Sequence, residues 1–574
     1  MKSSEQLRSE LAAINHKSYP AYKSLKGEYR FPGYILSIDH VQGDPFASPS
    51  HVSIRMESKR CGFPVEMLQG RRNQRALADY LLRGFGHNAG RFSFKAGGSG
   101  KSGLISVSRC GQEILERSAC SVGEEEIVVR FHVGFPANGR TINSPELAKI
   151  FFDFLPGAVT QSFMYRNLDA SAVRDYLNLA EDQEYIRGQL KERGLTAFVA
   201  DGAVLPRESG VSGRPMKGAV KFRSPDSLRI SMTLPNRGEI SGMGVPEGIT
   251  LIVGGGYHGK STLLSALQSG VYDHIPGDGR EYVITDASGV KIRSEDGRFV
   301  KDVDISMFIS NLPNGKDTRC FSTEDASGST SQAAAIVESM EAGSRLILLD
   351  EDTSATNFMV RDTFMQEVIA RDKEPITPFL ERARDLYTKA GISTILVAGS
   401  SGAFFHIADT VIQMDNYVPV DIKEKVERLL PGYPLPEGNC PEMRMPSSKR
   451  IMTKDTTVHT RRNYYGKQTD KPERVKIRVN GTDGFSMGHD EIDLRYIEQI
   501  VDQEQMAALA DILKYVCENM VDGRRTLGEA AGKVVDKLDK EGFGFFRQGG
   551  YIPAGLAMPR AQEIFACLNR FRRP

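Results

Sequence analysis

The sequence predicts an α/β protein built around a parallel sheet, and three observations carry that prediction. The first is a glycine-rich run, Gly254 to Ser261, that lies between an apolar stretch and a helical one. The second is a short apolar run that ends in Asp350 and Glu351. Continuous apolar runs of this length are typical of parallel strands buried on both faces. The third is the composition, 40% hydrophobic and 26% charged over 574 residues, which is that of a globular protein of several domains.

Two loop-like stretches divide the chain. A Gly/Ser/Pro cluster at 208–215 and a Pro/Gly-rich stretch at 431–438 lack the periodicity of helices or strands. We therefore predict an α/β N-terminal accessory domain at 1–210, a central domain at 211–420, and a C-terminal region at 421–574 that begins with a basic segment and continues into helices. Within these parts we expect a strand at 126–133 and helices at 75–82 and 504–520.

Charge and cysteine content exclude some classes of protein. The 74 Lys and Arg residues nearly balance the 73 Asp and Glu residues, which excludes a uniformly basic nucleic-acid binder. The seven cysteines form no Cys-x-x-Cys pair, so we expect free thiols in a reducing compartment. No run approaches the 18 apolar residues that typically mark a membrane helix. We therefore expect a soluble protein without a membrane span.

The glycine-rich run matches the phosphate-binding pattern Gly-x4-Gly-Lys-Ser/Thr. It follows the predicted strand 249–253 and precedes the helical stretch 262–267. Glycines in such a loop let backbone N–H groups surround phosphate oxygens at a helix N-terminus. Lys260 is expected to reach the β- and γ-phosphates of ATP, and the Ser261 hydroxyl to ligate Mg²⁺. The residues we expect to contact the nucleotide are Gly254, Gly255, Gly256, His258, Gly259, Lys260, Ser261 and Thr262.

The two carboxylates at the end of the second apolar run have the chemistry of a metal ligand and a base. Ligands gather at the carboxyl ends of parallel strands, so we expect Asp350 beside Ser261 at the metal. Glu351 is expected to polarise the attacking water, with Lys260 as its catalytic partner at the phosphates.

The order of motifs resembles that of ABC-type ATPases. Residues 326–333 resemble the signature that opens a helix, and 345–357 resemble the Walker B strand and D-loop. Together with the runs 39–50 and 98–103, the arrangement is similar to the soluble predicted ATPases of the ABC class. The resemblance implies an ABC-type P-loop core between α/β N-terminal and mixed C-terminal accessory domains. It also implies ATP and Mg²⁺ as cofactors and a head-to-tail homodimer, in which one subunit completes the other's site with Ser327, Gly328 and Ser329.

Two residues of the family pattern are missing. The predicted strand 394–398 ends in Gly399 where the family has its switch histidine, so we expect slow or differently switched hydrolysis. His406 follows seven residues later, and we interpret it as a core histidine. No glutamine stands at the expected Q-loop position, and Asn311 is our candidate replacement.

Two basic segments are candidates for nucleic-acid binding. Residues 444–478 hold eleven basic and three acidic residues, and 55–101 hold ten and three. Basic residues interleaved with tyrosines suit phosphate contact and base stacking on single-stranded RNA. The candidate contacts are Lys101, Arg461, Arg462, Tyr464, Tyr465 and Lys467. The run around Lys101 fits a plain turn as well as a phosphate contact. A solvated surface or a site for an acidic protein explains the charge equally well, and the family resemblance favours RNA.

The sequence thus predicts an ATP-binding, slowly hydrolysing enzyme that binds RNA, with a place in a larger RNA-processing complex. Two alternatives stay open: a module in which ATP only locks the dimer, and an ATPase that remodels an acidic protein partner. The resembling family includes a kinetoplastid mitochondrial RNA-binding ATPase associated with RNA editing. If the chain is of that type, its compartment is the mitochondrial matrix, and otherwise the cytoplasm.

Overall fold

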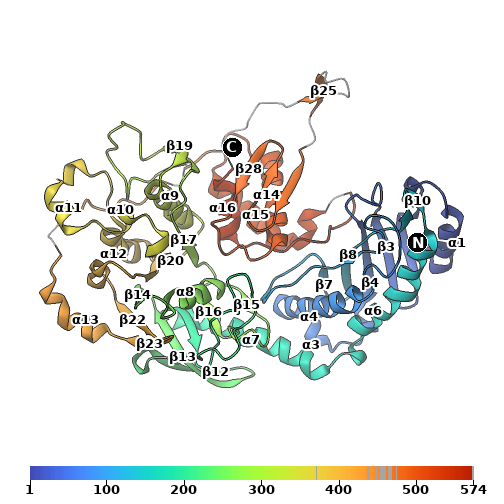
Figure 1. Cartoon of the computed structure of the whole chain (residues 1–574), viewed down its shortest axis with the longest axis horizontal. Coiled ribbons are helices and arrows are strands. Elements are labelled where there is room, and N and C mark those ends of the chain that lie inside the picture. Colours follow the sequence, from blue (N-terminus) through green and yellow to red (C-terminus); the bar gives the residue numbers. More distant parts are fainter. Residues whose placement is uncertain are drawn as a thin grey trace. The chain divides into compact units, whose positions relative to one another are not determined.

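The computed structural model describes residues 1–369, 371–435, 440–447, 449–452, 460–462, 468–472, 475–547 and 549–571. The chain forms two compact units (Figure 1). Unit 1 contains Met1–Asp182 and Glu541–Met558, and unit 2 contains Gln183–Lys540 and Pro559–Pro574. A stretch of the C-terminal region therefore belongs to the same compact unit as the N-terminal residues, and we call Glu541–Met558 the C-terminal strap. The three-part division drawn from the sequence stays a prediction.

Unit 1 is built on a mostly antiparallel sheet. Its strands run in the order β1 (Lys2–Ser3), β2 (Gly27–Phe31), β3 (Tyr34–His40), β4 (Ser50–Glu57), β8 (Glu126–Val133) and β5 (Ile105–Ser106), and β7 (Cys120–Val122) also pairs with β8. Strand β8 confirms the predicted strand at 126–133, and helix α4 (Arg71–Gly90) contains the predicted helix at 75–82.

One face of this sheet is apolar and buried. Residues alternate along β4, with Val52, Ile54 and Met56 buried and their neighbours half-buried, as a strand with two different faces requires. Phe85 of α4 packs edge-on against Phe131 of β8, with ring centroids 5.3 Å apart. Hydrophobic contact with α4 thus fixes which face of the sheet is covered.

The remaining elements of the N-terminal residues are short, apart from a long helix that runs from unit 1 into unit 2. They are α1 (Ser4–Ile14), α2 (Ser58–Cys61), α3 (Val65–Leu68), β6 (Glu113–Ile114), β9 (Ala137–Asn138), β10 (Thr141–Ile142), α5 (Ser144–Ala148), α6 (Leu155–Phe163) and α7 (Ala170–Glu192).

Unit 2 contains the predicted parallel sheet. Its strands run in the order β17 (Val290–Ile292), β20 (Leu346–Asp350), β21 (Ser393–Val397), β14 (Ile249–Val253), β22 (Thr410–Asp415) and β23 (Val418–Asp421). All neighbouring pairs are parallel except β22 and β23, which form a hairpin. The strand predicted at 249–253 is β14.

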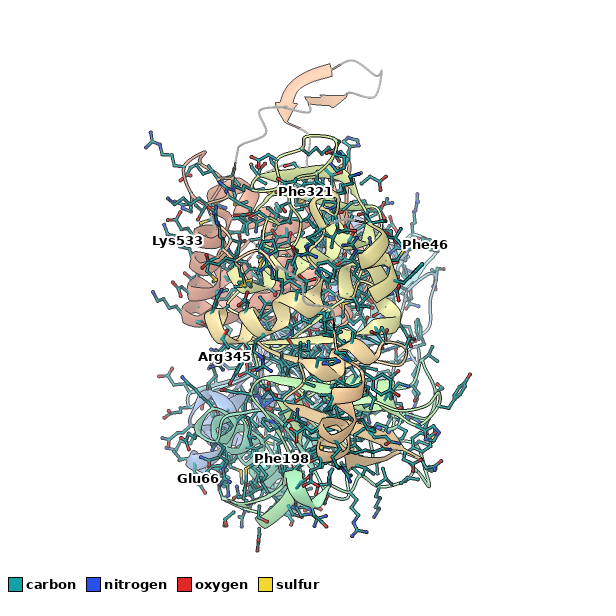
Figure 2. The ribbon with its side chains drawn as sticks, turned by 90° about the vertical axis from the view of Figure 1, so that its left-hand side faces the viewer. Phe46, Glu66, Phe198, Phe321, Arg345 and Lys533 are labelled. Carbon is teal, nitrogen blue, oxygen red and sulfur yellow. The ribbon has the colours of Figure 1, made fainter. Side chains whose placement is uncertain are left out.

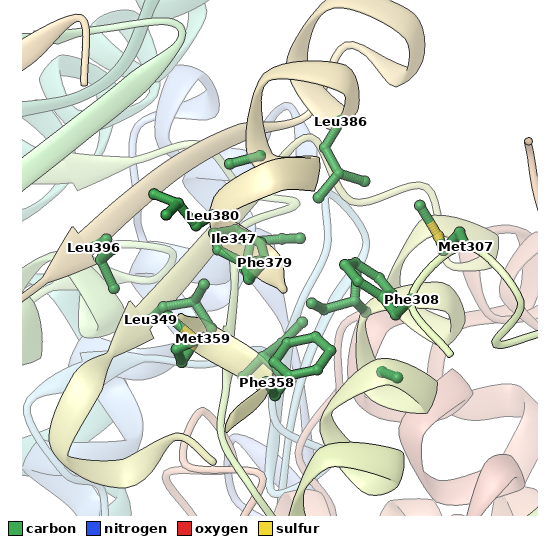
Figure 3. Packing of buried hydrophobic residues seen from close by; sticks show 14 of the residues in the cluster. Met307, Phe308, Ile347, Leu349, Phe358, Met359, Phe379, Leu380, Leu386 and Leu396 are labelled. Carbon is green, nitrogen blue, oxygen red and sulfur yellow. The ribbon is translucent and has the colours of Figure 1, made fainter. Parts of the chain in front are cut away.

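The central strands are apolar throughout because both faces of the sheet are buried. Along β20, Ile347 and Leu349 point into one core, whereas Leu346 and Leu348 point into another. The first core also holds Phe308 and Phe358, whose ring centroids lie 5.0 Å apart (Figure 3). Both strand faces need apolar residues, so the sequence shows a continuous run instead of an alternation.

The second core lies between the parallel sheet and an antiparallel one. This four-stranded sheet has the order β12 (Arg229–Leu234), β13 (Gly238–Pro246), β11 (Leu195–Ala200) and β16 (Val283–Thr285). Val199 of β11 and Val245 of β13 share a core with Leu264, which follows the glycine-rich run. Phe198, on the opposite face of β11, is fully buried (Figure 2).

The other elements of unit 2 carry the signature-like run and the C-terminal region. They are α8 (Lys260–Ser269), β15 (Asp273–His274), β18 (Arg298–Val303), β19 (Phe321–Ala326), α9 (Gly328–Glu341), α10 (Thr356–Met359), α11 (Thr363–Val368), α12 (Phe379–Ala390), α13 (Lys423–Leu429), β24 (Thr460–Arg462), β25 (Gln468–Pro472), β26 (Ile477–Asn480), β27 (Gly484–Met487), β28 (Asp490–Asp493), α14 (Gln503–Asn519), α15 (Leu527–Glu541) and α16 (Ala561–Asn569). Helix α14 confirms the helix predicted at 504–520 within one residue at each end. Among the described residues, no helix is long and apolar enough to cross a membrane.

Candidate nucleotide-binding site

The glycine-rich run forms a tight loop between β14 and α8, as the sequence predicts. Gly254 and Gly259 have φ values of 141° and 99°, which side-chain-bearing residues rarely adopt. A Cβ at Gly254 would lie 2.5 Å from the carbonyl oxygen of Met414, and one at Gly259 would lie 2.8 Å from the Tyr417 ring. Both glycines are therefore required by the backbone and by close neighbours.

The lysine of this loop points back over it. Nζ of Lys260 donates hydrogen bonds to the carbonyl oxygens of Gly254 and Gly255, at 2.7 and 2.9 Å. Ser261, in the first turn of α8, is exposed. The ammonium group and the N-terminus of α8 thus face the same loop, which is the arrangement that holds phosphate oxygens.

A turn far along the chain holds the loop in place. Nδ1 of His258 accepts a hydrogen bond from the Asn416 N–H at 2.9 Å and lies 3.3 Å from a carboxylate oxygen of Asp415. The Tyr417 N–H donates to the carbonyl oxygen of His258 at 3.0 Å. His258 therefore anchors the loop to the β22–β23 turn. This anchor was not predicted from the sequence, in which only Asn416, a residue common in turns, indicates a turn at this place.

The switch segment after β21 holds the carboxylate of Glu351. Oε2 of Glu351 accepts hydrogen bonds from the N–H groups of Gly399 and Ser400, at 2.7 and 2.9 Å. A Cβ placed on Gly399 would lie 4.0 Å from Cε and Nζ of Lys260. Glu351, Lys260 and the switch segment therefore meet at one place. Where the family has an imidazole, this chain presents two backbone N–H groups.

Asp350 lies at the end of β20, two strands away from β14 in the same parallel sheet. The carboxyl ends of both strands lie at the same edge, where Ser261 begins α8. Asp350 is 7% exposed. Its Oδ1 accepts a hydrogen bond from the Asp352 N–H at 3.2 Å. Burial raises the pKa of Asp350, and the Asp352 N–H and Lys291 oppose that shift only in part.

If Asp350 ligates Mg²⁺, as we predict from the sequence, its raised pKa should make metal binding sensitive to acid. A carboxylate must be deprotonated to ligate Mg²⁺, and Asp350 takes up its proton at a higher pH than an ordinary aspartate. We expect Mg²⁺-dependent nucleotide affinity to weaken on acidification before ordinary aspartates titrate, and metal-free nucleotide affinity to change less. Titration of a fluorescent ATP analogue with and without Mg²⁺ from pH 7.5 to 5 measures this. Parallel curves would show that Asp350 is not a ligand.

The signature-like run begins helix α9. Ser327 is the N-cap of α9, and its Oγ accepts a hydrogen bond from the Thr330 N–H. A Cβ on Gly328 would lie 2.4 Å from Oγ of Ser294 and 3.3 Å from the Ala355 Cβ. The hydrogen bonds of Ser327 stay within its own turn, which includes the buried Ser329. In the described part of the chain, none of them reaches Lys260 or Glu351.

Gln332, which the sequence analysis did not place in the site, ties the signature helix to the segment after Glu351. Its Nε2 donates to Oγ of Ser354 at 2.9 Å, and its Oε1 accepts from the Ala355 N–H at 3.0 Å. Gln332 is fully buried. Gln332 therefore holds α9 against residues 354–355 of the same chain.

Two further residues are singled out because family residues are missing: Asn311 as a candidate replacement and His406 as a core histidine. Asn311 lies in an exposed loop with a φ of 54°, and its role stays a prediction. Our interpretation of His406 as a core histidine is wrong: it is half-buried and lines a groove of about 870 Å³ that also contains Glu351 and Ser400. A short helical turn places it there, since of residues 402–406 only Phe404 enters the core.

The candidate RNA contacts are only partly described. Tyr464, Tyr465 and Lys467 lie outside the described residues. Arg461 and Arg462 lie in β24, which pairs with β25. The Lys101 N–H donates to the carbonyl oxygen of Pro45 at 2.8 Å, in a loop packed against residues 45–46.

The charge count in residues 55–101 overstates the free positive charge there. At least five of its ten basic residues lie within 4.0 Å of a carboxylate. These ion pairs are Arg55–Glu28, Arg60–Glu57, Arg71–Glu116, Arg72–Glu181 and Arg83–Asp79. Folding thus neutralises much of this segment, mostly through partners distant in sequence.

Comparison with known families explains this combination of elements. Models named "ATPase of the ABC class N-terminal", "P-loop domain" of the ABC ATPases and "MRB1590 C-terminal domain" match residues 4–166, 169–448 and 476–574. The chain belongs to the ATPases of the ABC class. Within this ABC-class ATPase, Asp350, Glu351 and the signature-like run all lie in the P-loop domain.

Among curated proteins, the ABC-class ATPase described here is similar to the uncharacterized protein MJ1628 of Methanocaldococcus jannaschii. The two are 32% identical over 232 residues, 38% of this chain and half the length of that relative. Two solved structures of MJ1267, an ATP-binding cassette of an ABC transporter, also match. One, in its ADP conformation, is 13% identical and covers 34% of this chain and 89% of its own, with a TM-score of 0.23. The other is 11% identical and covers 41% and 95%, with a TM-score of 0.25.

Proposed function

We propose that this ABC-class ATPase binds and hydrolyses ATP with Mg²⁺, as a homodimer, and couples the nucleotide to the binding of single-stranded RNA. The observation that carries the hydrolysis is the placement of Glu351. One carboxylate oxygen accepts from the Gly399 and Ser400 N–H groups. Among the described residues its other oxygen, Oε1, accepts no hydrogen bond. An oriented carboxylate with an open oxygen is what a water-polarising base requires.

The residues of the loop fit ATP and Mg²⁺. The glycines leave a cradle that a Cβ would fill at Gly254 and Gly259. Lys260 and the N-terminus of α8 supply the positive charge that phosphates need, and Ser261 and Asp350 offer the oxygens that Mg²⁺ prefers. Bound Mg²⁺ would neutralise charge on the phosphates. Lys260 would exchange its two carbonyl contacts for phosphate oxygens, while Glu351 orients a water.

The position of the signature-like run supports the proposed homodimer. Ser327 caps an exposed helix N-terminus, and its hydrogen bonds stay within its own turn. A helix N-terminus is a favourable site for an anion. In this proposal a second copy supplies the phosphate that the exposed Ser327 and the backbone N–H groups of Gly328 and Ser329 contact, and ATP joins the two copies.

RNA binding is supported by the basic segment at 444–478 and by the family resemblance noted in the sequence. The match of residues 476–574 to the MRB1590 C-terminal domain supports a role in RNA processing or editing, in a larger complex. The mitochondrial matrix is the compartment that we propose with this role.

Labelled single-stranded oligonucleotides test the RNA coupling. We expect the wild-type chain to bind RNA with an affinity that falls linearly in log K against log salt, and that changes when a non-hydrolysable ATP analogue is added. Lys260→Ala should still bind RNA but lose the effect of the analogue, because the lysine holds phosphates and not RNA. Fluorescence anisotropy at two salt concentrations measures both. Absence of RNA binding under every condition would reject this part of the proposal.

A further inference from the structure

Opposite its buried face, the unit 1 sheet carries polar side chains in rows that cross three strands. Ser37 of β3 pairs in register with Ser53 of β4, which pairs with Arg130 of β8. The neighbouring row joins His51 of β4 to His132 of β8, with ring centroids 4.7 Å apart. Many antiparallel sheets have one polar face that is exposed to solvent, so a polar face alone does not indicate a binding site.

Here the C-terminal strap covers part of that face. The Ser118 N–H donates to the carbonyl oxygen of Leu556 at 2.9 Å, and Oγ of Ser118 accepts from the Leu556 N–H at 3.1 Å. Tyr551 of the strap packs edge-on against His51, with ring centroids 5.5 Å apart. The strap does not fill the space beneath it, because a cavity of about 190 Å³ remains.

The cavity is lined by charged and hydrogen-bonding side chains from the sheet and the strap, among them Asp39, Arg55, Arg130, Arg547 and Tyr551. One water needs about 10–15 Å³ of such space, so the cavity has room for a group the size of a sugar phosphate or a base. The histidines nearby do not make a metal site: among the described residues, no three His, Cys, Asp or Glu side chains are placed to hold an ion.

The arginines that line the cavity differ in whether a carboxylate lies within ion-pair distance. Arg55 lies 2.7 Å from Glu28 and 3.8 Å from Glu126, so its charge is neutralised. Within the described part of the chain, the hydrogen bonds that Arg130 donates go to neutral oxygens, at 2.8 Å to the Ser118 carbonyl and 3.3 Å to Ser121 Oγ. Burial lowers the pKa of Arg130. Cys120 and the carboxylates of Asp39 and Glu126 oppose that shift only in part, and the nearby Arg547 guanidinium adds to it. An anion between the two guanidinium groups would relieve their repulsion.

Asp39 limits what that anion can be. Its two carboxylate oxygens each accept one hydrogen bond, from the Ser37 and Ser53 hydroxyls at 2.7 Å. Each oxygen has a further lone pair for another donor. A purely anionic ligand such as a free phosphate would be repelled by this carboxylate. A ligand with an anionic group and a hydroxyl donor, near an aromatic ring, satisfies all the groups, and a ribonucleotide has these features.

We propose that this cavity holds one nucleotide of a single-stranded RNA, with its phosphate between Arg130 and Arg547, its base against Tyr551, and its ribose 2′-hydroxyl donating to Asp39. The inference rests on the proposed RNA-binding function and assigns it a site in unit 1. Because DNA lacks the 2′-hydroxyl, Asp39 makes the site selective for RNA.

Substitutions in the full-length chain test the site. Arg547→Gln and Tyr551→Leu should each weaken binding of a labelled 12-nucleotide RNA about tenfold, since a phosphate contact or a stacking surface is lost. Arg140→Gln is the matched control, because Arg140 is exposed, lies outside both basic segments and does not line the cavity. Asp39→Ala should reduce the preference for RNA over DNA of the same sequence severalfold.

The outcomes separate this site from the proposed function as a whole. If the wild-type chain binds RNA and the Arg547 and Tyr551 variants bind it as tightly as Arg140→Gln does, the cavity is not the site and RNA binding stands. If the wild-type chain binds no RNA, both proposals fail. Crosslinking of 4-thiouridine RNA to the wild-type chain, with mass mapping, needs no variant to fold: crosslinks to the peptide at 549–558 are expected, and their restriction to other peptides would overturn the site.

Discussion

Glu351→Gln is expected to keep ATP binding and to lose at least a hundredfold in turnover. The amide oxygen of glutamine can still accept from the Gly399 and Ser400 N–H groups, so the switch segment should stay in place. The amide cannot take up a proton from water as a carboxylate does, and loss of such a base typically costs 10²–10⁴-fold. Steady-state phosphate release and binding of a fluorescent ATP analogue measure the two properties.

The matched control for that variant is Glu424→Gln, at an exposed position of α13, where turnover should not change. Unchanged phosphate release in Glu351→Gln would remove Glu351 from the mechanism. Slow release in the wild-type chain that Lys260→Ala does not reduce would instead favour ATP as a ligand that only locks the dimer.

Arg298→Met is expected to destabilise unit 2 by about 3–5 kcal/mol. The Arg298 side chain is 3% exposed and forms an ion pair with Glu338, which is 6% exposed. Removing one partner of a buried pair leaves the other charge uncompensated, and the cost is of this order. Arg384→Met is the matched control, because Arg384 pairs with Asp409 at 2.8 Å at the surface and should lose about 1 kcal/mol or less. Pulse proteolysis in urea compares the variants.

Acid should narrow the difference between Arg298→Met and the wild-type chain. Burial opposes the ionisation of Glu295, but Arg570 and Arg298 overcome that effect and lower its pKa. A carboxyl with a lowered pKa stabilises the folded state above the pKa of the unfolded chain, and this stabilisation is lost as the pH falls through the folded pKa. Arg298→Met keeps only the part of this stabilisation that Arg570 provides, so its free energy of unfolding should fall less on acidification than that of the wild-type chain. A difference that is constant from pH 7 to pH 3, through the range in which Glu295 takes up its proton, would show that Glu295 does not contribute.

Local rules determined the centre of the nucleotide site from the sequence alone. The strand at 249–253, the loop to Ser261 and the strand before Asp350 follow from patterns within a few residues: continuous apolar runs, and glycines at positive φ. These features can be predicted without knowing which elements are their neighbours, because a parallel sheet that is buried on both faces requires apolar residues at every position of its strands.

Only the tertiary structure decided what holds these parts together. The donors to Glu351 are 48 and 49 residues away, and the partner of His258 is 158 residues away. The strap brings residues near 550 into the same unit as a sheet formed from residues 2–133. Arg55 and Arg71 of segment 55–101 form ion pairs with Glu28 and Glu116, which lie outside that segment. Such pairs depend on which strands become neighbours. Backbone N–H groups are present at every residue except proline, so the residue types in a sequence do not indicate which of them will serve as donors. The two N–H groups that stand where the family has its histidine could therefore be found only in the folded chain, where they contact Glu351.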